Sequence, residues 1–154
     1  GDAKVIDLLN EILTMELTAI NQYFLHAKMC RNWGYKALAE HIRHESIDEM
    51  KHADKLIERI LYLEGLPNVQ RIGKINVGQT VVEMFKNDYG VEQIAIPLLN
   101  KAIQTCRDVG DNGTEALLTS ILTSEEEHVD WLEAQLELVK QVGEQNYLAQ
   151  QMRG

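Results

Sequence analysis

Apolar side chains recur every three or four positions along most of the chain, which is the spacing of one buried face of an α-helix. Glycine or proline interrupts this pattern after each of the first four runs, where a helix should end. The pattern predicts five helices, over residues 3–33, 35–64, 81–109, 114–142 and 145–152. Thr114 is the expected N-cap of the fourth helix.

Four of the predicted helices have nearly 30 residues, which corresponds to about 45 Å at 1.5 Å per residue. Helices of that length suit a chain of 154 residues only if they lie side by side. The first and third links are short, so each should join an antiparallel pair, whereas residues 67–80 are numerous enough to cross a whole bundle. We expect an all-α fold with a single domain over residues 1–154: a four-helix bundle with one long crossover and a short C-terminal fifth helix.

The composition is 45% hydrophobic and 25% charged, as in folded globular proteins, and the formal net charge is -9. This charge repels phosphate backbones and anionic lipid, so we expect neither nucleic acid nor membrane as a partner. No apolar run has the length of about 18 residues that a membrane span needs. Cys30 and Cys106 stand alone, which fits a reducing compartment, and the expected location is cytoplasmic.

Two Glu-x-x-His motifs carry the candidate chemistry, one in the second predicted helix and one in the fourth. Each places a carboxylate and an imidazole one turn apart on the same helix face. The second motif follows the first by 125 − 49 = 76 residues, and two further glutamates, in the first and third helices, have the same offset, 92 − 16 = 76. Each half of the chain therefore repeats one ligand set, and the six residues are Glu16, Glu49, His52, Glu92, Glu125 and His128.

Apolar neighbours surround these six residues, so their four carboxylates should share one core and would repel one another strongly if left bare. Two divalent cations would balance the four negative charges. Mixed carboxylate and imidazole ligands suit iron, manganese or zinc, and the ligand set does not choose among them. The alternative is a solvated acidic face on each helix, because a single Glu-x-x-His motif often arises by chance in an acidic helical protein.

Several longer segments resemble the bacterioferritin family. They are LTAINQYFLH at 17–26, HESIDEMKHAD at 44–54, LEGLPN at 63–68, SEEEHVDWLE at 124–133 and the tail NYL at 146–148. The resemblance covers the whole chain, and it implies a ferritin-like four-helix bundle. It also implies that the six residues with the repeated spacing form a ferroxidase site that binds two iron ions per subunit.

By the same resemblance, the activity would be oxidation of Fe(II) with dioxygen or hydrogen peroxide, followed by storage of the Fe(III) mineral. The subunits would form a hollow homo-oligomeric shell of 24, with co-assembly of a second subunit type left open. One haem b per subunit pair would lie between two subunits, with Met50 of each as an axial ligand. An electron-donor protein such as a ferredoxin would serve iron release.

Three further residues are candidates for supporting roles. Tyr23 lies two turns after Glu16, so it could hydrogen-bond a metal ligand or supply an electron, and an ordinary buried tyrosine is the alternative. His44 and Asp48 stand four residues apart, and by the resemblance they could bind iron on the inner wall of the shell. A solvated pair is the alternative for these two residues.

Other functions remain open at this stage. A haem-free ferritin is the nearest one, and another di-iron carboxylate oxidase or peroxidase could use the same ligands. A rubrerythrin-like peroxidase is disfavoured because the chain has no Cys-x-x-Cys pair. A twelve-subunit ferritin with metal between subunits is disfavoured because one chain supplies all six ligands, and a metal-free helical scaffold would take up no metal at all.

Overall fold

The computed structural model describes residues 1–153, and it confirms the all-α four-helix bundle with a short fifth helix. The helices are α1 (Ala3–Asn32), α2 (Lys36–Tyr62), α3 (Val81–Val109), α4 (Asn112–Val142) and α5 (Glu144–Gln151). Their ends differ from the predicted ones by at most two residues, and residues 1–153 contain no strand. Within the same range, no helix is both long enough and apolar enough to cross a membrane.

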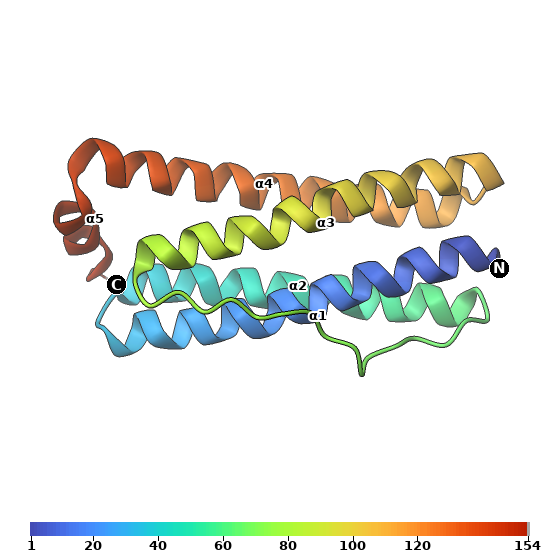
Figure 1. Ribbon diagram of the computed structural model, residues 1–154, viewed down its shortest axis with the longest axis horizontal. Coiled ribbons are helices and arrows are strands. Elements are labelled where there is room, and N and C mark those ends of the chain that lie inside the picture. The colour runs from blue at the N-terminus through green and yellow to red at the C-terminus, as the bar shows by residue number, and fades with distance from the viewer. Residues whose placement is uncertain (154) are drawn as a thin grey trace.

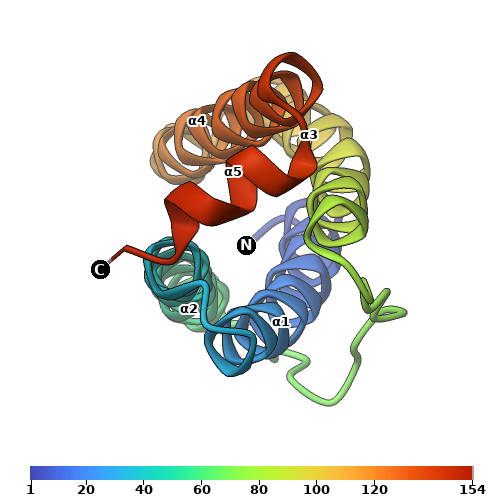
Figure 2. The same ribbon diagram turned by 90° about the vertical axis from the view of Figure 1, so that its left-hand side faces the viewer.

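The four long helices lie side by side as two hairpins, α1 with α2 and α3 with α4 (Figure 1). The segment between α2 and α3 runs along the outside of the bundle from one end to the other, as the long crossover predicted from its length. An end-on view shows α5 lying across one end of the bundle, from α4 towards α2 (Figure 2). Its Tyr147 is buried, and its ring packs edge-on against Phe85 of α3, with ring centroids 6.0 Å apart.

Side chains cap the first turns of three helices, α1, α3 and α4. The carboxylate of Asp2 accepts hydrogen bonds from the backbone N–H groups of Lys4 and Val5, and Thr80 caps α3 by accepting from the N–H of Glu83. The expectation that Thr114 caps α4 is wrong: α4 begins at Asn112, and Asp111 is the cap. The Asp111 carboxylate accepts from both the N–H and the hydroxyl of Thr114, which places the helix start two residues earlier.

The buried apolar residues form two clusters, one towards each end of the bundle. The first joins the N-terminal half of α1 to the C-terminal halves of α2 and α3 and to the start of α4. The second joins the C-terminal half of α1 to the start of α2 and α3, the middle of α4 and α5. Glu16, Glu49, Glu92 and Glu125 fall between the two clusters along their helices, so a buried polar layer separates two apolar ones. This layering fixes the depth at which the carboxylates sit.

Polar side chains about two turns apart on α1 fasten the crossover to the bundle. The hydroxyl of Thr18 accepts from the N–H of Gly73, and Nε2 of His26 accepts from the N–H of Gly78, at 2.7 and 2.9 Å. Because Nε2 of His26 is an acceptor, the ring proton sits on Nδ1, which donates to the buried carboxylate of Asp88 at 2.9 Å. The crossover is thereby tied to α1 and, through Asp88, to α3.

Candidate metal centre

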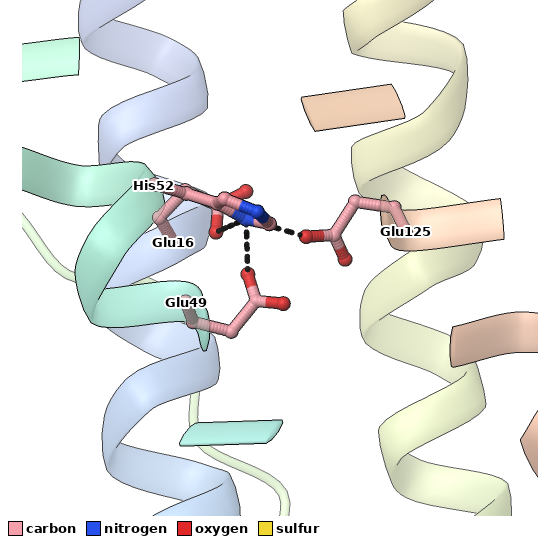
Figure 3. A group of neighbouring side chains, drawn as sticks. All are labelled: Glu16, Glu49, His52 and Glu125. Atoms are coloured by element: carbon pink, nitrogen blue, oxygen red, sulfur yellow. Dashed lines mark ion pairs between the residues drawn. The ribbon is translucent and has the colours of Figure 1, made fainter. Parts of the chain in front are cut away.

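Four carboxylates and two imidazoles converge in the polar layer, and every long helix contributes at least one of them. Five of the six residues are no more than 4% exposed, and the side chain of His52 is 14% exposed. Their donor atoms form two groups, each within 4.8 Å: Glu16, Glu49, His52 and Glu125 in one, and Glu49, Glu92, Glu125 and His128 in the other. Figure 3 shows the first group, with Glu125 reaching across from α4. The structure thus brings all six sequence-predicted residues together.

Glu49 and Glu125 belong to both groups. A carboxylate has two oxygen atoms, so each of these residues can bind one cation with each oxygen and hold two cations side by side. Each group also has a glutamate and a histidine of its own, from one hairpin. The arrangement therefore offers two equivalent cation positions with two shared carboxylates between them.

Distances within the first group show how closely the donors face one another. Nδ1 of His52 lies 3.0 Å from Oε1 of Glu125 and 3.4 Å from Oε2 of Glu16. Its distance to Oε2 of Glu49 is 3.6 Å. In the second group, Nδ1 of His128 lies 3.6 Å from Oε1 of Glu92.

Several of these buried atoms lack a hydrogen-bond partner of acceptable geometry. They are Oε2 of Glu16, Nδ1 of His52, Oε2 of Glu92, both carboxylate oxygens of Glu125 and Nδ1 of His128. Burying such atoms unpaired costs about 1–3 kcal/mol each, so a cluster of them is a destabilising feature of the fold. Cations bound between them would satisfy the oxygen and nitrogen lone pairs together, and iron, manganese and zinc all accept this donor set.

The electrostatics of the cluster keep protons on it when no cation is bound. Burial, followed by the charges of Glu16 and Glu125, holds the pKa of Glu49 well above its usual range. Burial and the neighbouring Glu125 carboxyl group likewise raise the pKa of Glu92. For His52, burial favours the neutral ring, but the nearby carboxylates of Glu125 and Glu16 outweigh it and raise its pKa to about 10.

His128 and Tyr23 border the second cation position. Burial favours a neutral His128, but the nearby carboxylates of Glu92 and Glu45 raise its pKa. Tyr23 is fully buried, its hydroxyl donates to Oε1 of Glu92 at 2.7 Å, and its ring meets that of His128 edge-on at 5.1 Å. Burial and the charge of Glu92 raise the pKa of Tyr23, so the phenol stays protonated and acts as a donor.

The remaining candidates lie apart from the cluster. Met50 is 44% exposed and belongs to neither apolar cluster. Nε2 of His44 lies 3.1 Å from Oε1 of Glu40, which stands one turn before it, whereas Asp48 stands one turn after it. The His44 side chain is 63% exposed. Asp48 is half-buried and joins neither donor group. An inner-wall iron site at His44 and Asp48 therefore stays a prediction.

The sequence analysis did not identify two residues next to His128, Glu45 and His41. Oε2 of Glu45 lies 3.7 Å from Nδ1 of His128, and Oε1 of Glu45 lies 3.2 Å from Nε2 of His41. The His41 ring stacks on Trp131, with centroids 3.8 Å apart and planes 13° apart. Burial alone would raise the pKa of Glu45, but the adjacent imidazole of His41 and the charge of His128 lower it. Helical spacing was the available signal, because Glu45 stands seven residues before His52 and so shares its face.

Comparison with known proteins agrees with the fold and the cluster. A sequence model described as the ferritin-like domain matches residues 6–142. Bacterioferritin of Mycobacterium tuberculosis is 53% identical over 150 residues, which make up 97% of this chain and 94% of that protein. Bacterioferritin of Streptomyces coelicolor is 50% identical over 149 residues (97% and 89%), and that of Brucella melitensis is 43% identical over 147 residues (96% and 91%).

Proposed function

The chain belongs to the bacterioferritin family of ferritin-like proteins, and from this premise we propose that it is an iron-storage subunit that oxidises Fe(II) at the buried cluster. The observation that carries the proposal is the pair of donor groups with two carboxylates in common. A single metal site would need no shared carboxylates, whereas a dinuclear site needs ligands that hold two ions at a fixed separation. The ligands proposed for the two iron ions are Glu16, Glu49, His52, Glu92, Glu125 and His128.

Two Fe(II) ions are the substrate, and each loses one electron. Dioxygen takes up the two electrons with two protons and becomes hydrogen peroxide, or hydrogen peroxide takes them up and becomes two water molecules. The shared residues Glu49 and Glu125 keep the two ions together, so that both electrons reach one oxidant molecule. Tyr23 orients Glu92 by its hydrogen bond, which fixes a terminal ligand of the second ion.

Storage requires an enclosed space, which one subunit cannot provide. We propose that subunits assemble into a hollow shell of 24 in the cytoplasm, where Fe(III) leaves the cluster and collects as mineral. The formal net charge of -9 per chain favours a high local concentration of cations. Release requires reduction of the mineral, and a ferredoxin-like electron donor would supply it.

A haem b shared by two subunits fits the residues around Met50. Met50 is 44% exposed, so its thioether could bind an iron atom from outside the subunit. Arg43 stands seven residues earlier on the same face and lines a hollow of about 300 Å³ together with Lys28, Arg31 and the carboxylate Glu40. The three positive side chains outnumber the one negative side chain there, which suits the carboxylates of a haem. When bound, the haem would supply a one-electron redox group for reducing stored iron.

The nearest alternatives use the same cluster. A haem-free ferritin would show the same iron oxidation without Met50 acting as a ligand. Another di-iron oxidase or peroxidase would oxidise iron without storing it. Both differ from the proposal in a measurable way, because only a storage shell continues to take up iron after the cluster has turned over.

The test is anaerobic loading of the assembled protein with Fe(II), addition of oxidant, and measurement of ferric absorbance with time. We expect about two rapidly oxidised ions per chain, followed by slower uptake of many more. The double variant Glu49→Ala with Glu125→Ala should lose the rapid phase while the assembly stays intact. A matched control is Glu58→Ala with Glu126→Ala, which removes two exposed glutamates from the same helices. A rapid phase that persists in the first double variant would overturn the proposal.

A further inference from the structure

A second, smaller group of donors lies beside the cluster on the side of His128. It consists of the His41 ring and the Glu45 carboxylate, which no role assigned so far uses. We infer that His41 and Glu45 form a third cation position, through which divalent metal passes between solvent and the buried pair. This inference rests on the proposed function, because the third position would carry metal ions to and from the dinuclear cluster.

Exposure increases stepwise from the cluster to the surface along this group. The side chain of His128 is 4% exposed, that of Glu45 is 16% exposed and that of His41 is 37% exposed. Glu45 lies between the two imidazoles, with one oxygen facing each ring. A cation held by His41 and Glu45 would thus be one ligand exchange away from His128.

The separations suit a shared cation. Two donors that each lie about 2.1 Å from one ion, at a tetrahedral angle, are about 3.4 Å apart. Nε2 of His41 and Oε1 of Glu45 are 3.2 Å apart, and Oε2 of Glu45 and Nδ1 of His128 are 3.7 Å apart. Neither nitrogen has a hydrogen-bond partner of acceptable geometry, although both atoms are buried. Hydrogen bonding therefore leaves these donors unsatisfied, and a cation would satisfy them.

Aromatic contacts hold the ring of His41 in place beside Glu45. The ring lies flat on the indole of Trp131, and Trp131 meets Phe85 edge-on at 5.6 Å. The stack on Trp131, which Phe85 contacts in turn, restrains the imidazole, and Nε2 of His41 lies 3.2 Å from Oε1 of Glu45. By contrast, the similar pair of His44 and Glu40 is 3.1 Å apart but has side chains 63% and 58% exposed.

The test counts bound Co²⁺ per chain in the assembled protein by equilibrium dialysis and visible absorption. The wild type should bind two ions tightly and a third about 10–100-fold more weakly, as expected for a site with few protein ligands. His41→Phe keeps a ring on Trp131 but removes Nε2, and Glu45→Gln removes the charge. Both variants should bind two ions, while Glu40→Gln, the same change in the exposed pair, should bind three.

Stopped-flow oxidation of Fe(II) gives an independent readout. In His41→Phe and Glu45→Gln, the number of rapidly oxidised ions should stay at about two per chain, while the rate at limiting Fe(II) falls about tenfold. If the wild type binds only two ions, and His41→Phe binds the same two with an unchanged oxidation rate, the third position is overturned. The dinuclear cluster is then still intact. Loss of one of the two tight ions in His41→Phe would also overturn the third position, because His41 would then belong to the cluster itself. Failure of the wild type to bind two tight ions would instead reject the proposed function.

Discussion

Metal binding at the cluster should release protons, because the pKa values of several of its groups are raised when no cation is present. Burial and neighbouring carboxylates raise the pKa of Glu49 and Glu92 well above their usual range. His52 has a pKa of about 10, because the nearby carboxylates of Glu125 and Glu16 outweigh the effect of burial. Carboxylates and imidazoles bind cations only in their deprotonated forms. Two divalent ions should therefore displace at least one proton per chain, from His52, together with any proton held by the two glutamates.

The magnitude follows from linkage between protons and metal. Each proton released makes binding about tenfold stronger per unit of pH, so the combined affinity for two ions should rise at least about tenfold per unit near neutral pH. Calorimetry with Zn²⁺, which undergoes no redox reaction, measures the count directly when it is repeated in buffers of different ionisation enthalpy. Glu126→Gln, which removes an exposed carboxylate beside Glu125, should leave the count unchanged. Release of fewer than one proton would refute the charge assignment.

The same shifts determine how the stability of the metal-free protein depends on pH. The folded-state pKa values of Glu49, Glu92 and His52 lie above their unfolded values, so the folded state binds more protons than the unfolded state. For His52, whose pKa rises from 6.5 to about 10, the free energy of unfolding must fall as pH rises from 7 to 9, by up to about 1.4 kcal/mol per pH unit. Thermal unfolding followed by circular dichroism would show this fall, and saturating Zn²⁺ should flatten it. A metal-free protein that becomes more stable over this range would contradict the reasoning.

Three substitutions elsewhere test other parts of the structure. Met50→Leu should abolish the visible haem spectrum without changing the rapid phase of iron oxidation, and a retained spectrum would exclude Met50 as the ligand. His26→Ala removes one of the two donors to the buried carboxylate of Asp88, leaving only Gln22, and leaves the N–H of Gly78 without its acceptor, so chemical denaturation should show a loss of about 3 kcal/mol, partly restored in His26→Gln. Gly90→Ala places a methyl group where nothing lies within 4 Å inside a helix, so it should raise the free energy of unfolding by about 1 kcal/mol, and a lower thermal midpoint would count against this.

Periodicity was sufficient to predict the helices because each long helix buries one continuous face. It could not fix the start of α4, where two competing caps stand three residues apart. The hydroxyl of Thr114 donates to Asp111 instead of capping a helix of its own, so the earlier residue defines the start. Nor could it predict how the crossover is held. The polar side chains of Gln22 and His26 follow the helical period like core residues, but they pair with loop backbone and with Asp88.

For the candidate site, too, sequence spacing predicts some features, and others depend on how the helices pack. A repeat of Glu and Glu-x-x-His at one offset requires that two hairpins carry equal ligand sets, because residues at matching positions on paired helices reach the same depth. Spacing alone treats the four glutamates alike, however. Only the three-dimensional arrangement makes Glu49 and Glu125 common to both donor groups. The proposed third cation position at His41 depends on a contact between α2 and α4, where the His41 ring stacks on Trp131 and faces Glu45. The periodicity of either helix alone does not predict a contact between the two helices. Function at this centre therefore depends on residues whose role appears only when the helices are packed.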